Sequence, residues 1–248
     1  MEKESVSQLL AALDDMDIYA SDHRSNQSSV TTPTWSCNGI DLYLCDGVEM
    51  MFNIGRGDID VVITDPPYGN GTDYGSGGYQ DTRENLIRLI SRFLPNCFRI
   101  AHRTIITPGV GNLWLYPEPK WTLSWVEPAG CGSGPWGFCC WQPILAYGSD
   151  PYMAAGLGQR PDTYIGHGQQ ASDSRHPCAK PLDFMDWLVA RTTTEEGQTI
   201  LDPFMGIGTT AVAAIKRRRR FRGAEINAAY FDVAVERCEI AMKEQLNH

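Results

Sequence analysis

A short apolar run at residues 59–64 (IDVVIT) leads directly into the segment Asp65-Pro66-Pro67-Tyr68-Gly69. An almost unbroken run of apolar residues is typical of a parallel strand that is buried on both faces of a sheet. In open α/β sheets, ligands bind at the carboxyl ends of such strands. The run therefore predicts an α/β fold in which this segment stands at a binding edge.

Strand-like and helical stretches alternate along the rest of the chain. Strand patterns occupy residues 40–45, 103–107, 121–126, 143–147, 199–201 and 221–226, and helical patterns occupy residues 85–98, 182–192, 209–219 and 228–245. This alternation predicts a doubly wound, mainly parallel sheet of the Rossmann-like class. We expect one such domain at residues 36–248, after a polar, acidic leader at residues 1–35. Residues 69–79 are rich in glycine and are expected to form a mobile loop.

The composition limits the classes of function that the chain can have. Hydrophobic residues make up 42% of its 248 residues, and no stretch approaches the ~20 apolar residues of a membrane span. The first residues lack a signal-peptide pattern, so we expect a cytoplasmic protein. The formal net charge of −9 argues against a protein coated in nucleic acid, but binding to DNA depends on a local surface. The longest basic run, residues 216–220, favours a solvated helix end, with a phosphate contact as the alternative.

Cysteine and tryptophan positions allow two further expectations. None of the eight cysteines belongs to a C-x-x-C pair, so we expect reduced, mostly buried thiols and no metal site. We expect core or interface positions for most of five tryptophans, with one near DNA: Trp114, Trp121, Trp125, Trp136 and Trp141.

The segment after the first apolar run has a definite chemical character. Pro66 and Pro67 stiffen the turn and withhold backbone donors, which leaves carbonyls and the Asp65 carboxylate as acceptors. Such a site suits a ligand that brings hydrogen-bond donors, for example an amino group. The ring of Tyr68 offers a flat apolar face on which a base could stack.

Two later segments indicate a bound ligand. Residues 200–210 (ILDPFMGIGTT) read as a short strand, a glycine turn and a helix start, and the next strand ends in Glu225. Glycines allow close approach of a ligand, and an acidic residue at that strand tip commonly holds ribose hydroxyls. The third segment, residues 176–181 (HPCAKP), places Lys180 just before a helix, where it could meet a carboxylate.

Together these segments resemble the amino-methyltransferases of DNA, the family that methylates the amino group of adenine or cytosine. The resemblance covers residues 40–241 and rests on Asp65-Pro66-Pro67-Tyr68, on the 202–210 segment and on residues 176–181. It implies an S-adenosylmethionine-dependent methyltransferase fold with a circularly permuted motif order, since the catalytic motif precedes the cofactor motif as in the family's β group. Residues 44–47 (LCDG) and 141–145 (WQPIL) also resemble family elements.

The resemblance implies residue roles. Asp65, Pro66, Pro67 and Tyr68 would be catalytic: Asp65 and the Pro66 carbonyl would accept the hydrogens of a flipped-out base's amino group. S-adenosyl-L-methionine would be the cofactor, with no metal. The cofactor contacts would be Asp46, Asp65, Lys180, Asp202, Pro203, Phe204, Gly206, Gly208, Thr209, Thr210, Glu225 and Ile226.

Several alternatives stay open at this point. Aspartate at position 65 favours adenine by family tendency, and methylation of cytosine at its N4 amino group is the nearest rival. A non-catalytic, DNA-binding subunit on a methyltransferase fold is another, as is methylation of RNA or protein. Residues 149–174 would be the target-recognition segment, and the segment is short, which predicts a short or relaxed target. DNA is the expected partner, and the β group often dimerises, so we expect a homodimer.

Overall fold

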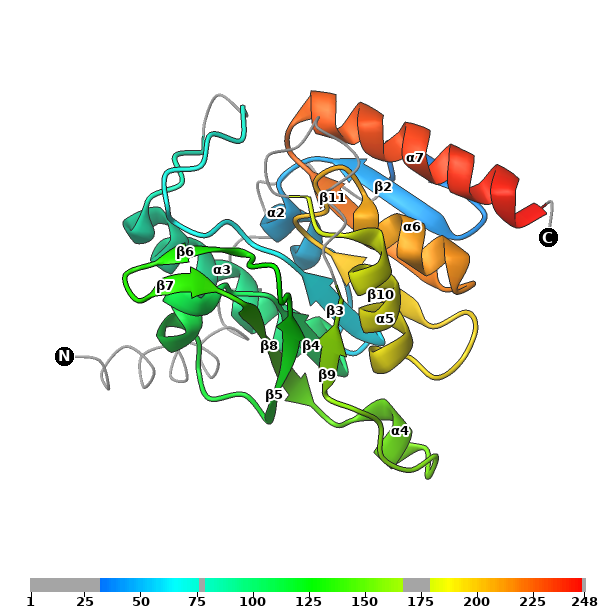
Figure 1. The fold of residues 1–248 in the computed structure, drawn as a ribbon. Helices are drawn as coiled ribbons and strands as arrows, with labels where there is room; N and C mark the ends of the chain where they lie inside the picture. The colour runs from blue at the N-terminus through cyan, green and yellow to red at the C-terminus, as the bar shows by residue number, and fades with distance from the viewer. Residues whose placement is uncertain (1–31, 76–78, 167–178, 247–248) are drawn as a thin grey trace.

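The computed structural model describes residues 32–75, 79–166 and 179–246 (Figure 1). Most of the expected leader, residues 1–35, lies outside these ranges. Its last residue, Trp35, already belongs to the first strand, β1 (Trp35–Cys37). Within the described ranges, no helix is both long and apolar enough to cross a membrane.

One nine-stranded sheet forms the centre of the protein. Its inner strands β2, β11, β10, β3 and β4 run parallel to one another, whereas β1 and β8 run antiparallel to their neighbours. The expected doubly wound, mainly parallel sheet is therefore confirmed. Its strand order is β1 (Trp35–Cys37), β2 (Ile40–Leu44), β11 (Arg220–Glu225), β10 (Thr199–Asp202), β3 (Val61–Thr64), β4 (Arg103–Ile106), β8 (Trp141–Gly148), β5 (Trp121–Val126) and β9 (Thr163–Ile165).

Helices cover both faces of this sheet (Figure 1). On one face, α2 (Gly47–Phe52) and α3 (Arg83–Ile100) pack together over a buried cluster that includes Val62 and Phe93. On the other, α5 (Leu182–Thr192), α6 (Thr209–Lys216) and α7 (Ala228–Leu246) pack over a cluster that includes Ile63 and Phe221. Strand β3 is buried at every position because its side chains enter both clusters.

The chain reverses its direction of winding between β10 and β3. These two strands are neighbours, and the chain passes from β3 through α3 to β4 on one side and from β10 through α6 to β11 on the other. A crevice opens at the carboxyl ends of the strands at such a switch point. Asp65 follows β3 and Pro203 follows β10, so the fold brings both expected motifs to this crevice.

Two elements differ from the sequence-based prediction. The helix expected at residues 209–219 ends at Lys216, because Arg218 takes a left-handed backbone conformation with φ of 54° and the next strand begins at Arg220. Residues 132–139 form an unexpected hairpin of β6 (Gly132–Gly134) and β7 (Gly137–Cys139), which projects beyond β5 and β8 (Figure 1).

The segment expected to read the target sequence, residues 149–174, contributes in part to the sheet. It contains the short helix α4 (Pro151–Ala154) and strand β9, which pairs in parallel with β5. Residues 167–174 lie outside the described residues. The glycine-rich loop is described at residues 69–75, where the Asp81 carboxylate accepts hydrogen bonds from the backbone N–H groups of Gly69, Asn70 and Thr72.

The expected burial is wrong for most of the described cysteines, and most of the five tryptophans are not in the core. Of the described cysteines, all of them free thiols, only Cys97 and Cys238 are buried. Of the five tryptophans, only Trp125 belongs to the core, and the other four are exposed. Trp136 lies in the hairpin and Trp114 follows β4, whereas Trp121 and Trp141 begin β5 and β8, where the first strand positions are not covered by the packed layers.

Candidate active site

Four side chains from three separate segments meet at the carboxyl end of β3. The Lys180 ammonium donates to Asp65 Oδ2 at 2.5 Å and to the Tyr68 hydroxyl at 2.6 Å. The Tyr68 hydroxyl and Thr107 Oγ1 both donate to Asp65 Oδ1, at 2.5 and 2.6 Å. The Asp65 carboxylate thus accepts three hydrogen bonds, and a ligand amino group could take the place of one of these donors.

This cluster is largely withdrawn from solvent. The side chains of Lys180 and Asp65 are 10% and 22% exposed, and the Lys180 ammonium also lies 5.0 Å from the centre of the Tyr68 ring. Attraction between charges is stronger in such a desolvated place than in water. The ammonium is therefore held tightly on the carboxylate, and a ligand amino group has to compete with Lys180 and Tyr68 for Asp65.

The turn after β10 is organised by Asp202. Its carboxylate is buried and accepts hydrogen bonds from Thr64 Oγ1 at 2.8 Å, Thr210 Oγ1 at 2.7 Å and the Phe204 N–H at 3.1 Å. Burial raises the pKa of Asp202 to about 6, and the hydrogen bonds from the two threonines oppose that rise. Asp202 thus ties the end of β3 to the start of α6 and fixes the turn between them.

Glycines in this turn are required by its geometry. Gly206 and Gly208 have φ of 54° and 75°, in the left-handed region that favours glycine. A Cβ atom on Gly208 would lie 2.9 Å from the Ala234 Cβ in α7, so a side chain would also collide there. The turn can therefore pass close to α7 and present its backbone to the crevice.

The strand tip of β11 carries Glu225. One carboxylate oxygen accepts the Gly206 N–H at 3.0 Å, and the other accepts the Asn227 N–H at 2.7 Å. Burial raises the pKa of Glu225 above its usual range, while these backbone hydrogen bonds oppose the rise. Each oxygen can accept a second hydrogen bond, so Glu225 has the capacity to bind a ligand's hydroxyl groups.

Asp46 has a structural role that the sequence did not predict. Its Oδ1 accepts hydrogen bonds from the Val48 and Glu49 N–H groups, which makes Asp46 the N-cap of α2. Next to it, a Cβ atom on Gly47 would lie 2.0 Å from the Pro203 carbonyl oxygen, so α2 begins directly against the β10 turn. Asp46 is thereby held at the wall of the crevice.

A cavity of about 1120 Å³, including the solvent space at its mouth, occupies this crevice. Most of the predicted site residues line this cavity. Among the predicted site residues, all of them described, only Pro66, Tyr68 and Gly208 do not line it. Those that do are Asp46, Asp65, Pro67, Lys180, Asp202, Pro203, Phe204, Gly206, Thr209, Thr210, Glu225 and Ile226. His176, Pro177 and Cys178 of the third motif lie outside the described residues.

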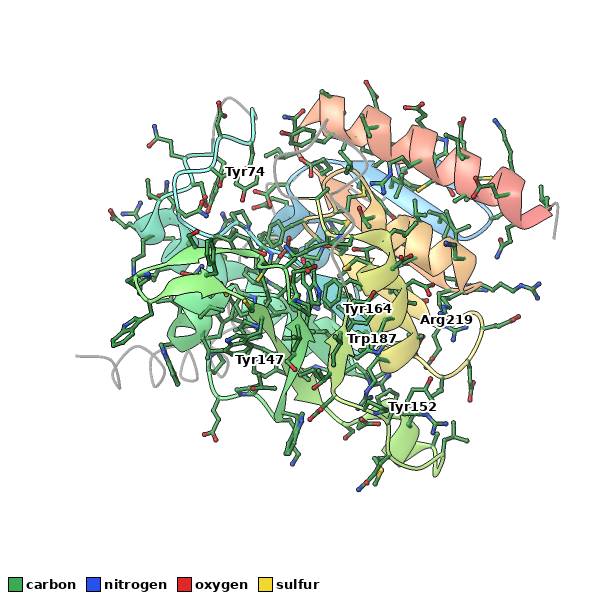
Figure 2. All side chains as sticks on the ribbon, in the orientation of Figure 1. Tyr74, Tyr147, Tyr152, Tyr164, Trp187 and Arg219 are labelled. Atoms are coloured by element: carbon green, nitrogen blue, oxygen red, sulfur yellow. The ribbon has the colours of Figure 1, made fainter. Side chains whose placement is uncertain are left out.

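Sequence reasoning missed several residues of the site. Thr107, at the end of β4, and Thr64, at the end of β3, hold the two aspartates, and their places at strand ends were the available signal. Three tyrosines also line the cavity: Tyr74, Tyr79 and Tyr230. Tyr74 extends from the glycine-rich loop (Figure 2), and its carbonyl accepts a hydrogen bond from the Asn227 side chain at 3.0 Å.

The basic run lies away from this cavity. Arg220 begins β11, whereas Glu225 ends it, so the run occupies the opposite edge of the sheet from the site. Arg217 forms an ion pair with Asp186, and Arg218 lies 3.6 Å from Glu196. Figure 2 shows Arg219 well separated from Tyr74. This arrangement agrees with the solvated helix end favoured from the sequence.

Among the residues that the structure describes, no group of three or more His, Cys, Asp or Glu side chains is arranged to hold a metal ion. The described wall of the cavity offers carboxylate, ammonium, hydroxyl and backbone groups to a ligand.

Comparisons with known proteins agree with this arrangement. Over 232 residues the chain is 24% identical to the type II methyltransferase M.HpaI of Haemophilus parainfluenzae, covering 80% of this chain and 74% of that protein. A further curated methyltransferase is 44% identical over only 64 residues, so that the chain matches 18% of its length.

Solved structures of low sequence identity share the fold. The PvuII DNA methyltransferase, described as cytosine-N4-specific, superposes with a TM-score of 0.65 at 13% identity, covering 89% of this chain and 97% of that one. The M1.HpyAVI-SAM complex superposes with a TM-score of 0.57 at 21% identity, covering 80% and 98%. These likenesses confirm the α/β methyltransferase fold.

A model of the DNA methylase family matches residues 107–236, a region that runs from the end of β4 into α7. It includes Thr107, Lys180 and the whole turn from Asp202 to Thr210. Because the match extends over more than half of its residues, this chain belongs to the DNA methylase family.

Proposed function

We propose that the protein transfers a methyl group from S-adenosylmethionine to the exocyclic amino group of a DNA base, most specifically adenine. One observation carries this proposal: the Asp65 carboxylate lies on the wall of the same cavity as the Gly206 turn and Glu225. Asp65, which could accept an amino group, and the Gly206–Glu225 region, which could bind a nucleoside, thus face the same cavity. Residues 36–248 would be the methyltransferase domain, and residues 149–174 would contribute to target recognition.

The cavity fits the cofactor chemically. Glu225 retains acceptor capacity for ribose hydroxyls, and the Tyr79 hydroxyl is a buried atom of the wall without a partner among the described residues. The Phe204 side chain adds an apolar surface to the wall, suited to a purine ring. The cofactor, when bound, supplies a methyl group on a sulfonium centre.

The residues around Asp65 account for activation of the amino group. An aromatic amino group is a weak nucleophile because its lone pair is delocalised into the ring. The Asp65 carboxylate and the Pro66 carbonyl would accept its two N–H bonds, which favours a pyramidal nitrogen and frees the lone pair. The amino nitrogen becomes positive as it is methylated, so the negative charge of Asp65 stabilises the transition state and can accept the released proton.

Lys180 has to leave Asp65, at least in part, for this step. Its ammonium lies at the carboxylate oxygen that an incoming amino group would use, and a positive charge held there would oppose positive charge on the nitrogen. The carboxylate of the cofactor's methionine part would offer Lys180 another partner. This exchange would couple binding of the cofactor to opening of Asp65.

Cytosine is the second candidate base, and the likeness to the cytosine-N4-specific PvuII enzyme favours it. The aspartate at position 65 is the argument for adenine, through its resemblance to the adenine enzymes. A non-catalytic DNA-binding subunit would bind the cofactor and transfer nothing.

One experiment separates these possibilities. The protein is incubated with S-adenosylmethionine carrying a labelled methyl group and with unmethylated DNA, which is then digested to nucleosides. Labelled N6-methyl-2′-deoxyadenosine is expected, and labelled N4-methyl-2′-deoxycytidine would select the rival base. Asp65→Ala should abolish transfer, whereas Asp232→Ala, an exposed aspartate of α7, should not. Cofactor binding by calorimetry without any transfer would leave the non-catalytic subunit.

A further inference from the structure

We propose that the hairpin of β6 and β7 is an aromatic wedge that enters the DNA base stack beside the extruded target base. The inference rests on the proposed function, because it takes DNA as the substrate. The wedge comprises residues 128–141 (PAGCGSGPWGFCCW), whose tip carries Trp136 and Phe138.

The rings at the tip are exposed to an unusual degree. Trp136 is 101% exposed and Phe138 is 84% exposed, and Trp141 at the base of the hairpin is 41% exposed. Large aromatic side chains gain much from burial, so a cluster of them on the surface marks a place where something binds. Packing within the part of the chain that the structure describes does not account for these rings, because none of them belongs to either buried cluster.

The direction of the strands places this surface at the same edge of the sheet as the candidate site. Strand β5 runs antiparallel to β8, which runs antiparallel to β4, which is parallel to β3. The carboxyl ends of β5 and β3 therefore share one edge of the sheet, and the hairpin leaves β5 at the edge where Asp65 follows β3. Trp114, 84% exposed, follows β4 at the same edge.

The charge of the hairpin favours DNA bases as the occupant. Residues 128–141 contain no charged side chain, whereas the whole chain has a formal net charge of −9 that repels phosphates. A neutral segment at the edge that holds the reactive carboxylate can approach DNA without that repulsion. Aromatic side chains stack on bases whatever the sequence, and apolar wedges open base steps in proteins that bend or unstack DNA. Extrusion of the target base leaves such an opening.

The test uses two hairpin variants and a matched control. Trp136→Ala and Phe138→Ala each remove one exposed ring. Trp121→Ala removes another exposed tryptophan, 62% exposed, from the start of β5 at the opposite edge. Binding is measured by fluorescence anisotropy with a labelled duplex of unmethylated DNA, as a function of salt, and methyl transfer is measured on that duplex and on its separated strands.

The Kd for the duplex should rise at least about fivefold in each hairpin variant, the equivalent of ~1 kcal/mol per stacked base. The slope of log Kd against log salt should not change, because no phosphate contact is removed. Transfer to the duplex should fall more than transfer to separated strands, which have no stack to open. Trp121→Ala should match the wild type in every measurement.

Two results would overturn the wedge. The first is duplex binding by Trp136→Ala and Phe138→Ala as tight as that of the wild type. The second is a change in the oligomeric state of the hairpin variants, measured by sedimentation, while their duplex binding is unaltered. That result would show that the rings join two copies of the chain. A wild-type protein that methylates DNA while either result holds would keep the proposed function and remove only the wedge. Unchanged urea midpoints confirm that the variants are folded.

Discussion

Replacing Asp65 with alanine should destabilise the fold through Lys180, apart from its effect on methyl transfer. The Lys180 side chain is 10% exposed, and among the described residues its ammonium donates to the Asp65 carboxylate and the Tyr68 hydroxyl. Without Asp65, this largely buried positive charge keeps only a neutral hydroxyl among its described partners. Removal of one member of a buried ion pair destabilises a protein by about 3–5 kcal/mol. Because the flexible lysine can turn partly toward water, we expect about 3 kcal/mol.

A second substitution isolates this cause. Lys180→Met keeps much of the apolar stem and removes the charge, so adding it to Asp65→Ala should recover about 2 kcal/mol of the lost stability. Urea unfolding gives these values: with a slope of about 2–3 kcal/mol per molar urea, Asp65→Ala should lower the midpoint by roughly 1 M, and the double variant should regain more than half of it. Asp232→Ala serves as the exposed control.

Additive effects of Asp65→Ala and Lys180→Met on the free energy of unfolding would refute this reasoning. If the destabilisation by the double variant equals the sum of the two single effects, Lys180 and Asp65 are not energetically coupled, and the contact between them does not hold the resting site. A stability gain in Asp65→Ala would refute it as well, since the carboxylate would then be the strained partner.

Three further predictions concern the cofactor, acid stability and the target. Glu225→Ala should weaken S-adenosylmethionine binding by ~1–3 kcal/mol in calorimetry, while the exposed Glu239→Ala should not; equal affinities would contradict the ribose contact. Burial raises the pKa of Asp202 from 3.8 to about 6, so the folded state binds more protons than the unfolded state between these values. The free energy of unfolding should then fall by about 2 kcal/mol as pH rises from 4 to 6, and Asp202→Asn should remove that slope in urea titrations; parallel curves would contradict the shift. Sequencing of methylated sites across a genome should reveal a short or relaxed target, and a strict target of six base pairs or more would refute the link to the short segment at residues 149–174.

The sequence by itself predicted the mainly parallel sheet and the edge of that sheet at which the cavity lies. The apolar run before Asp65 predicts a strand that is buried on both faces of a sheet. The glycines before Thr209 predict a tight turn with backbone angles that favour glycine. Most helix and strand positions followed from such periodicity for the same reason. The family motifs also predicted that Asp46, Asp65, Asp202 and Glu225 serve one site, and these four residues line one cavity.

Only the tertiary structure decided how those residues are used. The buried Asp202 carboxylate joins Thr64 to Thr210, and Thr64 reaches it only when β3 pairs with β10 in the assembled sheet. The cap that Asp46 forms on α2 is local, but its place against the β10 turn is tertiary. Thr107 lies far from Asp65 along the chain and has no motif of its own. The residue type alone does not predict whether a tryptophan is buried. Trp136 in the β6–β7 hairpin is fully exposed, whereas Trp125 in β5 is buried in the core. Burial depends on which elements pack together, and that is a property of the whole fold.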